Sequence, residues 1–181
     1  MSNVSLRTIG DAPTVWFTGL SGAGKTTIAR KVAQMLSEAG IAHVVLDGDD
    51  LRATLSADLG FSPEDRAEQV RRAAHLARIS TDAGLVALVA LVSPFRADRS
   101  AARAVHGSRR FIEVYVATPL SICERRDTKG LYSQSMQGHG HELTGIGQPY
   151  EAPDEADIVV DGSYEWNVDV LARRVFDRMR L

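Results

Sequence analysis

The chain has little of several things that mark common protein classes. One cysteine, Cys123, excludes an internal disulfide framework and a cysteine-rich zinc site. There is no basic excess: 21 basic residues face 23 acidic ones, which argues against a general nucleic-acid-binding protein. The longest apolar run, residues 85–92, is too short to span a bilayer, and residues 1–13 lack a signal-peptide core. We therefore expect a cytoplasmic protein with small-molecule partners, without nucleic acid or membrane as a partner.

The remaining composition is that of an ordinary globular protein. Hydrophobic residues make up 44% of the 181 residues and charged residues 24%, which suits a chain that buries one full core. We predict a single domain over residues 1–181, with an N-terminal extension at 1–13 and a lid region at about 128–151. The glycine-rich stretch 130–150 is expected to be a mobile loop or lid.

Strand-like and helix-like segments alternate along the chain. Short β-prone or apolar runs predict strands at 15–18, 43–46, 85–91, 111–116 and 157–160. Helical spacing and capping residues predict helices at 25–39, 49–56, 63–83, 97–105, 119–125 and 166–179. Such alternation predicts a three-layer α/β fold, a parallel sheet covered on both faces. Ligands then bind at the carboxyl ends of the strands.

A phosphate-binding motif follows the first predicted strand. Residues 19–26, GLSGAGKT, fit the pattern G-x-x-x-x-G-K-[ST] between a strand and a helix. Glycines let backbone N–H groups surround phosphate oxygens, and the helix N-terminus adds positive potential. Lys25 is expected to reach the β- and γ-phosphates, and the Thr26 hydroxyl to bind Mg²⁺.

The motif alone fits kinases, GTPases, motors and regulatory switches. The chain has no Asn-Lys pair and so lacks the guanine-binding N-K-x-D motif, and a motor domain is usually longer. A small-metabolite kinase is the best remaining class.

Acidic residues follow the second predicted strand. Asp47, Asp49 and Asp50 stand next to the expected Mg-nucleotide site, where carboxylates hold the metal's water shell or accept a hydroxyl proton. A solvated turn with a helix cap is the alternative for the same residues. Downstream, Arg52 and Arg66 suit an anionic substrate. Phe61 suits either stacking on a base or a core contact before a helix.

From about residue 14 to residue 151 the sequence resembles the adenylylsulfate kinase (APS kinase) family. The shared blocks are GLSGAGKTT at 19–27, DGD at 47–49, LGFSPEDR at 59–66, Ser93-Pro94 with Asp98-Arg99, Glu113-Val-Tyr, CERRDxKGLY at 123–132, and TGIxxPYE at 144–151. Many P-loop proteins share the first block, whereas the later blocks in this order are far more specific. The resemblance implies a P-loop kinase fold, a homodimer, and phosphorylation of the 3′-hydroxyl of adenosine 5′-phosphosulfate (APS) by Mg-ATP.

The resemblance also implies a role for each matching position. ATP would be bound by Ser21, Gly22, Ala23, Gly24, Lys25, Thr26, Thr27 and Arg125. Catalysis would rest on Lys25, Asp47, Asp49, Ser93 and Lys129, with Mg²⁺ at Thr26 and Asp49. The acceptor nucleotide would contact Asp47, Asp49, Asp50, Arg52, Phe61, Arg66, Gln69, Val92, Ser93, Lys129, Leu143, Thr144 and Gly145.

Three departures from the family pattern fall on the acceptor side. Asp50 and Gln69 each replace an asparagine, and Leu143 replaces the phenylalanine that supplies a second aromatic wall around the adenine. Two alternatives therefore stay open: a related kinase that phosphorylates another nucleotide-linked metabolite, and a non-catalytic nucleotide-binding module. His139 and His141 make a weak metal pair without a third ligand, and Cys123 is expected to be a buried, inert thiol.

Overall fold

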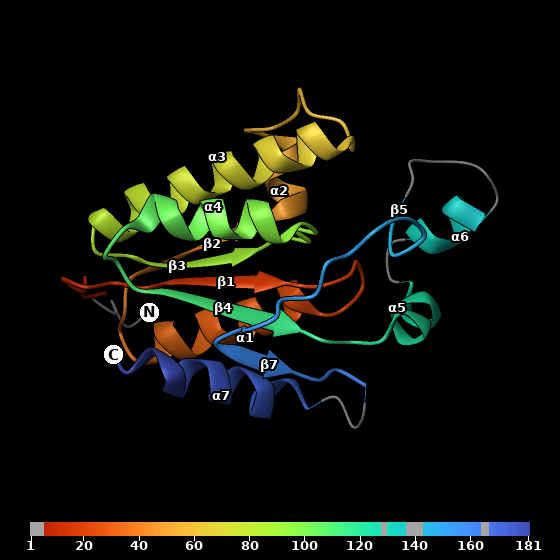
Figure 1. The fold of residues 1–181 in the computed structure, drawn as a ribbon. Helices are drawn as coiled ribbons and strands as arrows, with labels where there is room; N and C mark the ends of the chain where they lie inside the picture. Colours follow the sequence, from red (N-terminus) through yellow and green to blue (C-terminus); the bar gives the residue numbers. More distant parts are fainter. Residues whose placement is uncertain (1–5, 128–129, 137–142, 164–166) are drawn as a thin grey trace.

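The computed structural model describes residues 6–127, 130–136, 143–163 and 167–181, and its centre is a five-stranded parallel sheet (Figure 1). The strand order is β2-β3-β1-β4-β7. The strands are β1 (Thr14–Thr18), β2 (His43–Asp47), β3 (Val86–Ala90), β4 (Phe111–Val116) and β7 (Ile158–Val160). The predicted parallel sheet is confirmed.

Helices cover both faces of this sheet (Figure 1). One face carries α1 (Lys25–Glu38) and α7 (Val168–Met179), which pack against each other. The other carries α2 (Gly48–Ala53), α3 (Pro63–Asp82) and α4 (Arg96–His106). Two short helices, α5 (Leu120–Arg126) and α6 (Leu131–Met136), lie beyond the carboxyl ends of the strands. The predicted three-layer architecture is therefore confirmed. None of the described helices is long and apolar enough to cross a membrane.

The central strand β1 feeds two hydrophobic cores, one on each face of the sheet. Val15 and Phe17 pack in the core shared with α1 and α7, while Trp16 between them packs in the core with α3. All three side chains are fully buried. Successive side chains in a strand point to opposite faces, so a strand covered on both sides must be apolar throughout. This explains why β3 and the middle of β1, residues 15–17, are apolar without interruption.

Local capping sets the helix starts. The Ser62 hydroxyl accepts a hydrogen bond from the Asp65 backbone N–H at 3.2 Å, with Pro63 as the first residue of α3. The Asn167 side chain caps α7 in the same way, so that helix begins at Val168. The predicted start at Trp166 lies outside the described residues.

The segment 130–150, predicted to be a mobile loop or lid, contains regular elements in its described part, and its role as a lid stays a prediction. The segment contains α6 and two paired two-residue strands, β5 (Leu143–Thr144) and β6 (Gly147–Gln148). The Asp127 carboxylate accepts hydrogen bonds from the backbone N–H groups of Tyr132 and Ser133, both at 3.0 Å. Composition alone does not reveal this order, because α6 is fixed by contacts with its surroundings rather than by an apolar stripe of its own.

Candidate active site

A cavity of about 840 Å³ opens at the carboxyl ends of the strands, where the fold class places ligands. Its wall is contributed by the P-loop and α1, by α2 and α3, by the segment after β3, and by α5, α6 and β5. One side therefore carries the phosphate-binding motif, and we call it the nucleotide half. The opposite side carries α2, α3 and β5, and we call it the acceptor half.

The nucleotide half is built on the loop between β1 and α1. Gly24 has φ of 105°, a left-handed conformation that favours glycine, and Lys25 begins the helix directly after it. At Gly19 an added Cβ would lie 2.6 Å from the Val116 carbonyl oxygen, so a side chain does not fit. The Lys25 ammonium donates to the carbonyls of Gly19 and Leu20 at 2.9 and 2.8 Å. The loop is thus curled back on its own lysine.

The acidic residues after β2 meet the P-loop threonine. The Thr26 hydroxyl donates to Asp47 Oδ2 at 2.6 Å, and Asp47 Oδ1 accepts from the Asp49 backbone N–H at 2.9 Å. Asp47 is buried, whereas Asp49 and Asp50 are exposed on the cavity wall. Asp47 therefore caps α2 and also lines the cavity. The helix-cap interpretation of this turn and the functional one are compatible. A hydroxyl and carboxylates are the oxygen ligands that Mg²⁺ prefers.

Two arginines flank an aromatic ring in the acceptor half. The Arg52 guanidinium lies 4.3 Å and the Arg66 guanidinium 5.6 Å from the centre of the Phe61 ring. Burial lowers the pKa of both arginines, and for Arg66 the nearby Arg52 charge lowers it further. Both stay charged, because a guanidinium keeps its proton in proteins. Phe61 is 36% exposed and lines the cavity, so the alternative of a core contact is wrong.

Gln69 lies one helical turn beyond Arg66 in α3, and its side-chain amide is buried. The side chain is 4% exposed, and neither Nε2 nor Oε1 has a hydrogen-bond partner among the described residues. Leaving a buried amide unpaired costs about 1–3 kcal/mol. Because Gln69 also lines the cavity, it is placed to bond a ligand there.

Ser93 is held in a fixed and unusual conformation after β3. Its φ is 39°, a left-handed value that is rare for a residue other than glycine, and it is buried. Its Oγ accepts from the Trp16 indole N–H at 3.1 Å, and its carbonyl accepts from Arg99 at 2.8 Å. Thr18 donates to the Val92 carbonyl at 2.7 Å. These buried contacts over-determine the loop that closes the floor of the cavity.

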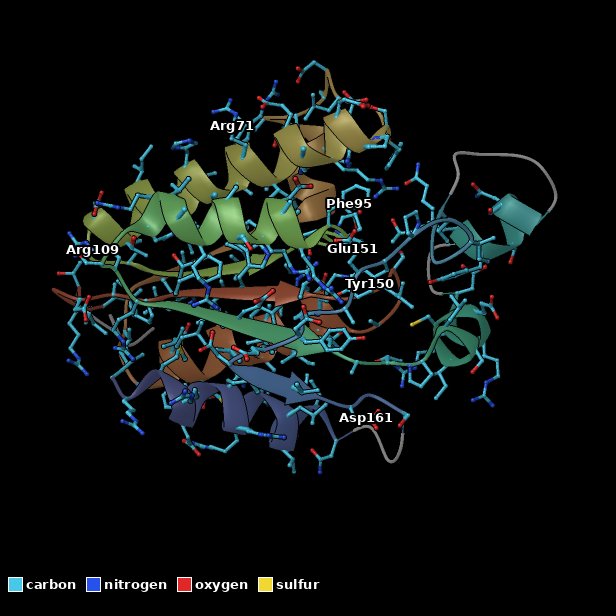
Figure 2. The ribbon with its side chains drawn as sticks, viewed as in Figure 1. Arg71, Phe95, Arg109, Tyr150, Glu151 and Asp161 are labelled. Carbon is cyan, nitrogen blue, oxygen red and sulfur yellow. The ribbon has the colours of Figure 1, made fainter. Side chains whose placement is uncertain are left out.

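The segment Leu143–Glu151, which we call the strap, runs from the cavity back to the sheet. Figure 2 shows Tyr150 and Glu151 beside Phe95, at the start of α4. The Tyr150 hydroxyl lies 2.9 Å from the Thr18 hydroxyl, and the Glu151 N–H donates to the Pro94 carbonyl at 2.9 Å. Burial raises the pKa of Tyr150, so this phenol stays protonated as a hydrogen-bonding group.

Most of the predicted site residues line this one cavity: Ser21, Gly22, Gly24, Lys25, Thr26, Thr27, Asp47, Asp49, Asp50, Arg52, Phe61, Arg66, Gln69, Val92, Ser93, Leu143 and Thr144. Three described ones, Ala23, Arg125 and Gly145, are not in its wall. Lys129, with His139 and His141, lies outside the described residues.

The wall also contains residues that the sequence analysis missed, among them Arg30, Arg126, Gln134 and Ser135. Arg30 stands one helical turn after Thr26, a spacing that would have found it. Arg126 lines the cavity, whereas its neighbour Arg125 is exposed. Gln134 and Ser135 belong to α6, a helix that the sequence pattern does not announce.

Two side observations bear on other chemistry. Cys123 is fully buried in α5, and burial raises the pKa of its thiol, as expected for an inert cysteine. Within the described residues, no group of three or more His, Cys, Asp or Glu side chains is arranged to hold a metal.

Fold and site together define a P-loop kinase, with a phosphate-binding loop and a cationic acceptor half facing one cavity. The family model for adenylylsulphate kinase matches residues 11–161. The chain belongs to the adenylylsulphate kinase family.

Relatives and solved structures agree with this assignment. An adenylyl-sulfate kinase from Klebsiella pneumoniae is 52% identical over 148 residues, which is 82% of this chain and 74% of that protein. The structure of Mycobacterium tuberculosis APS kinase in complex with AMPPNP and APS superposes with a TM-score of 0.91 at 44% identity, covering 94% of this chain and 99% of that one. The hexameric APS kinase from Thiobacillus denitrificans gives a TM-score of 0.71 at 30% identity, covering 94% of this chain and 29% of that one.

Proposed function

We propose that this protein is an ATP-dependent adenylyl-sulfate kinase. It transfers the γ-phosphoryl group of ATP to the 3′-hydroxyl of APS, giving ADP and 3′-phosphoadenosine 5′-phosphosulfate (PAPS). The observation that carries the proposal is the pairing, in one cavity, of a complete P-loop with an aromatic ring flanked by two arginines. The first suits a nucleoside triphosphate, and the second suits an adenine joined to an anionic group.

In the nucleotide half, the backbone of residues 21–27 and the Lys25 ammonium bind the phosphates. Lys25 already points along the loop, so phosphate oxygens replace the carbonyls to which it now donates. We assign Arg126, rather than Arg125, to the wall beside the ATP adenine, because Arg126 lines the cavity and is anchored by a 2.6 Å hydrogen bond to the Gly162 carbonyl. The role of Lys129 as a charge-neutralising residue remains a prediction.

In the acceptor half, Arg52 and Arg66 bind the phosphosulfate and Phe61 stacks on the adenine. Gln69 offers the buried, unpaired amide described above. The wall around the acceptor is completed by Asp50, Val92, Leu143 and Thr144. Ser93 shapes the floor rather than reacting, because its hydroxyl is buried and accepts from Trp16.

The transfer is an in-line displacement that positioning and charge neutralisation accelerate. A bond forms between the 3′-oxygen of the acceptor and the γ-phosphorus, and the bond from that phosphorus to the β,γ-bridging oxygen breaks. The acceptor's hydroxyl proton passes to the Asp49 carboxylate, with Asp47 beside it. Lys25 lies where negative charge accumulates on the leaving ADP.

The oxygen ligands of the site suit Mg²⁺. When bound, this ion would neutralise negative charge on the phosphoryl group that is transferred. Thr26 and Asp49 would hold it, with Asp47 in the surrounding water shell, because Thr26 is hydrogen-bonded to Asp47, Asp49 follows two residues later, and all three line the cavity. We also propose that the protein forms a homodimer, as the family resemblance implies, and that it is located in the cytoplasm.

The test is an acceptor panel. Purified protein with Mg-ATP is offered APS, AMP, ADP-ribose and UDP-glucose, and ADP release is followed by a coupled assay. We expect ADP release with APS only, at kcat/KM of about 10⁴ M⁻¹s⁻¹ or higher. Faster turnover of another nucleotide would make the protein a related kinase with a different acceptor. No ADP release with any acceptor while ATP still binds would favour a non-catalytic module.

A further inference from the structure

The strap connects the two halves of the cavity. At one end of its turn, an added Cβ on Gly145 would lie 3.1 Å from the Leu20 side chain, so the strap packs directly on the P-loop. Further along, the Gln148 side chain leaves the turn toward α3. Its Nε2 donates to the Phe61 carbonyl at 3.2 Å, a contact between residues 87 positions apart.

The Phe61 carbonyl is the meeting point of two donors. Besides Gln148 Nε2, it accepts from Arg66 Nε at 3.1 Å. The preceding carbonyls of Leu59 and Gly60 accept from Arg52 at 3.4 and 2.6 Å. Three consecutive carbonyls are therefore held by side chains from α2, α3 and β6, and this sets where the Phe61 ring stands.

The donors to these carbonyls differ in charge: two are cationic arginines and one is a neutral glutamine. Arg52 and Arg66 line the cavity, and a bound anion competes for their N–H groups, because a guanidinium attracts an anionic acceptor more strongly than a neutral carbonyl. Gln148 is uncharged and does not line the cavity, so an acceptor does not draw it away. It is the donor that still holds the loop once the arginines turn to the ligand.

One end of the half-buried Gln148 amide is enclosed by protein, while the bond that Nε2 makes lies near the surface. Its Oε1 is buried and has no partner among the described residues. Among the described residues the amide is therefore held by Nε2 alone, and losing that bond frees the side chain from the Phe61 carbonyl. Only the NH₂ group of the amide can donate to a carbonyl, which fixes its orientation.

We propose that Gln148 is a positioning residue of the acceptor site. It ties the backbone of Phe61 to the strap, so that seating of the strap on the P-loop fixes the ring against which the acceptor base stacks. Gln148 occupies one of the two positions that the family resemblance leaves open in TGIxxPYE, so the resemblance does not imply this role. The identity of the acceptor rests on the proposed function. The hydrogen bond from Gln148 to the Phe61 carbonyl, which we call the tie, does not.

The kinetic test compares Gln148→Met with the parent protein. Methionine keeps the length of the side chain and removes the donor. We expect the KM for APS to rise about three- to tenfold, the range for loss of one neutral hydrogen bond, with the KM for ATP within twofold. The matched control is Gln34→Met, on the exposed face of α1 with its amide bonded to Glu38, which we expect to match the parent.

A double-mutant cycle distinguishes positioning from general destabilisation. In a Phe61→Leu background, Gln148→Met should change the KM for APS by less than twofold, since the ring that it positions is gone. An unchanged KM in Gln148→Met, or an equal loss in both backgrounds, would overturn the proposal.

A measurement without turnover keeps the tie testable if APS is not the acceptor. Hydrogen–deuterium exchange of the backbone amides in residues 59–62 should be faster in Gln148→Met than in the parent and in Gln34→Met. Equal exchange in all three proteins would show that the tie does not order the loop. Failure of the parent to convert APS would count against the proposed function alone.

Discussion

The two halves of the cavity are assembled in opposite ways. The nucleotide half is built around one contiguous loop, residues 19–27, whose carbonyls at Gly19 and Leu20 accept from its own lysine. The acceptor half consists of side chains from α2, α3 and the strap, which meet over the carbonyls of residues 59–61. A phosphate-binding loop whose backbone conformation depends on glycines tolerates few substitutions. A site made of side chains from several elements can be altered by substituting one residue at a time. The departures from the family pattern at Asp50, Gln69 and Leu143 all fall in the second kind.

The largest effect should come from the carboxylate at the junction of the two halves. We expect Asp49→Asn to lower kcat by about 10²–10⁴-fold, the range for loss of a general base, while ATP binding changes little. Initial rates with APS and calorimetric titration with a non-hydrolysable ATP analogue measure the two quantities. Asp50→Asn removes the same charge one residue away and should cost far less. Near-normal turnover in Asp49→Asn would contradict its assignment.

A change confined to the acceptor half should affect one substrate only. We expect Arg66→Ala to raise the KM for APS about 10–100-fold, since a hydrogen bond to a charged group contributes about 1.5–3 kcal/mol. The KM for ATP should stay within twofold. The control is Arg71→Ala, because Arg71 is exposed on the outer side of α3 and paired with Glu68 (Figure 2). Equal losses for both substrates would show that the halves are not separable.

Restoring the aromatic wall should strengthen acceptor binding. Leu143 lines the cavity where the family pattern has phenylalanine. We expect Leu143→Phe to lower the dissociation constant for APS at least about fivefold, because stacking on a base contributes about 1–3 kcal/mol. Equilibrium titration with APS in the presence of ADP measures it. Weaker binding in the variant would indicate that this acceptor half is shaped for another nucleotide.

The smallest effect lies at the opposite end of the sheet and concerns stability alone. His106 is fully buried, bonds Thr14 and the Ala102 carbonyl, and has its pKa lowered from 6.5 mainly by burial; Arg78, Arg103 and Asp82 also face it. The unfolded chain therefore binds the proton more tightly. Stability is fully present above the ordinary histidine pKa and decreases as pH falls below it.

Urea unfolding at pH 7.5 and at pH 5.5 measures how the free energy of unfolding depends on pH. We expect part of the loss of stability between these pH values to disappear in His106→Gln and the whole loss to persist in His75→Gln, a variant of an exposed histidine of α3. Identical pH dependence in both variants would assign the effect to other groups.

Prediction from sequence succeeded where the determinant is local. The strands β1 and β3 are apolar because both faces are covered, and the P-loop spacing places Lys25 and Thr26 without tertiary information. The cap at Ser62 fixed the start of α3 in the same way. These features depend on a few neighbouring residues, so the pattern contains them.

Prediction failed where distant residues decide. The order of α6 comes from the Asp127 carboxylate and from the buried Tyr132, whose hydroxyl donates to the Ser21 carbonyl at 2.9 Å. Which of Arg125 and Arg126 lines the cavity depends on the side of α5 that faces it, and the expected role of Arg125 at the ATP adenine stays a prediction. The tie from Gln148 to Phe61 joins two loops that no local signal relates. Domain boundaries and the roles of individual site residues remain predictions.

The central claim is that ATP and APS meet in this cavity and exchange a phosphoryl group at the 3′-hydroxyl. The most direct test incubates the protein with Mg-ATP and APS, separates the nucleotides by ion-exchange chromatography and locates the new phosphate by ³¹P NMR. The account predicts ADP and PAPS in equal amounts, with the phosphate on the 3′-oxygen. APS recovered unchanged from protein that binds ATP would contradict it.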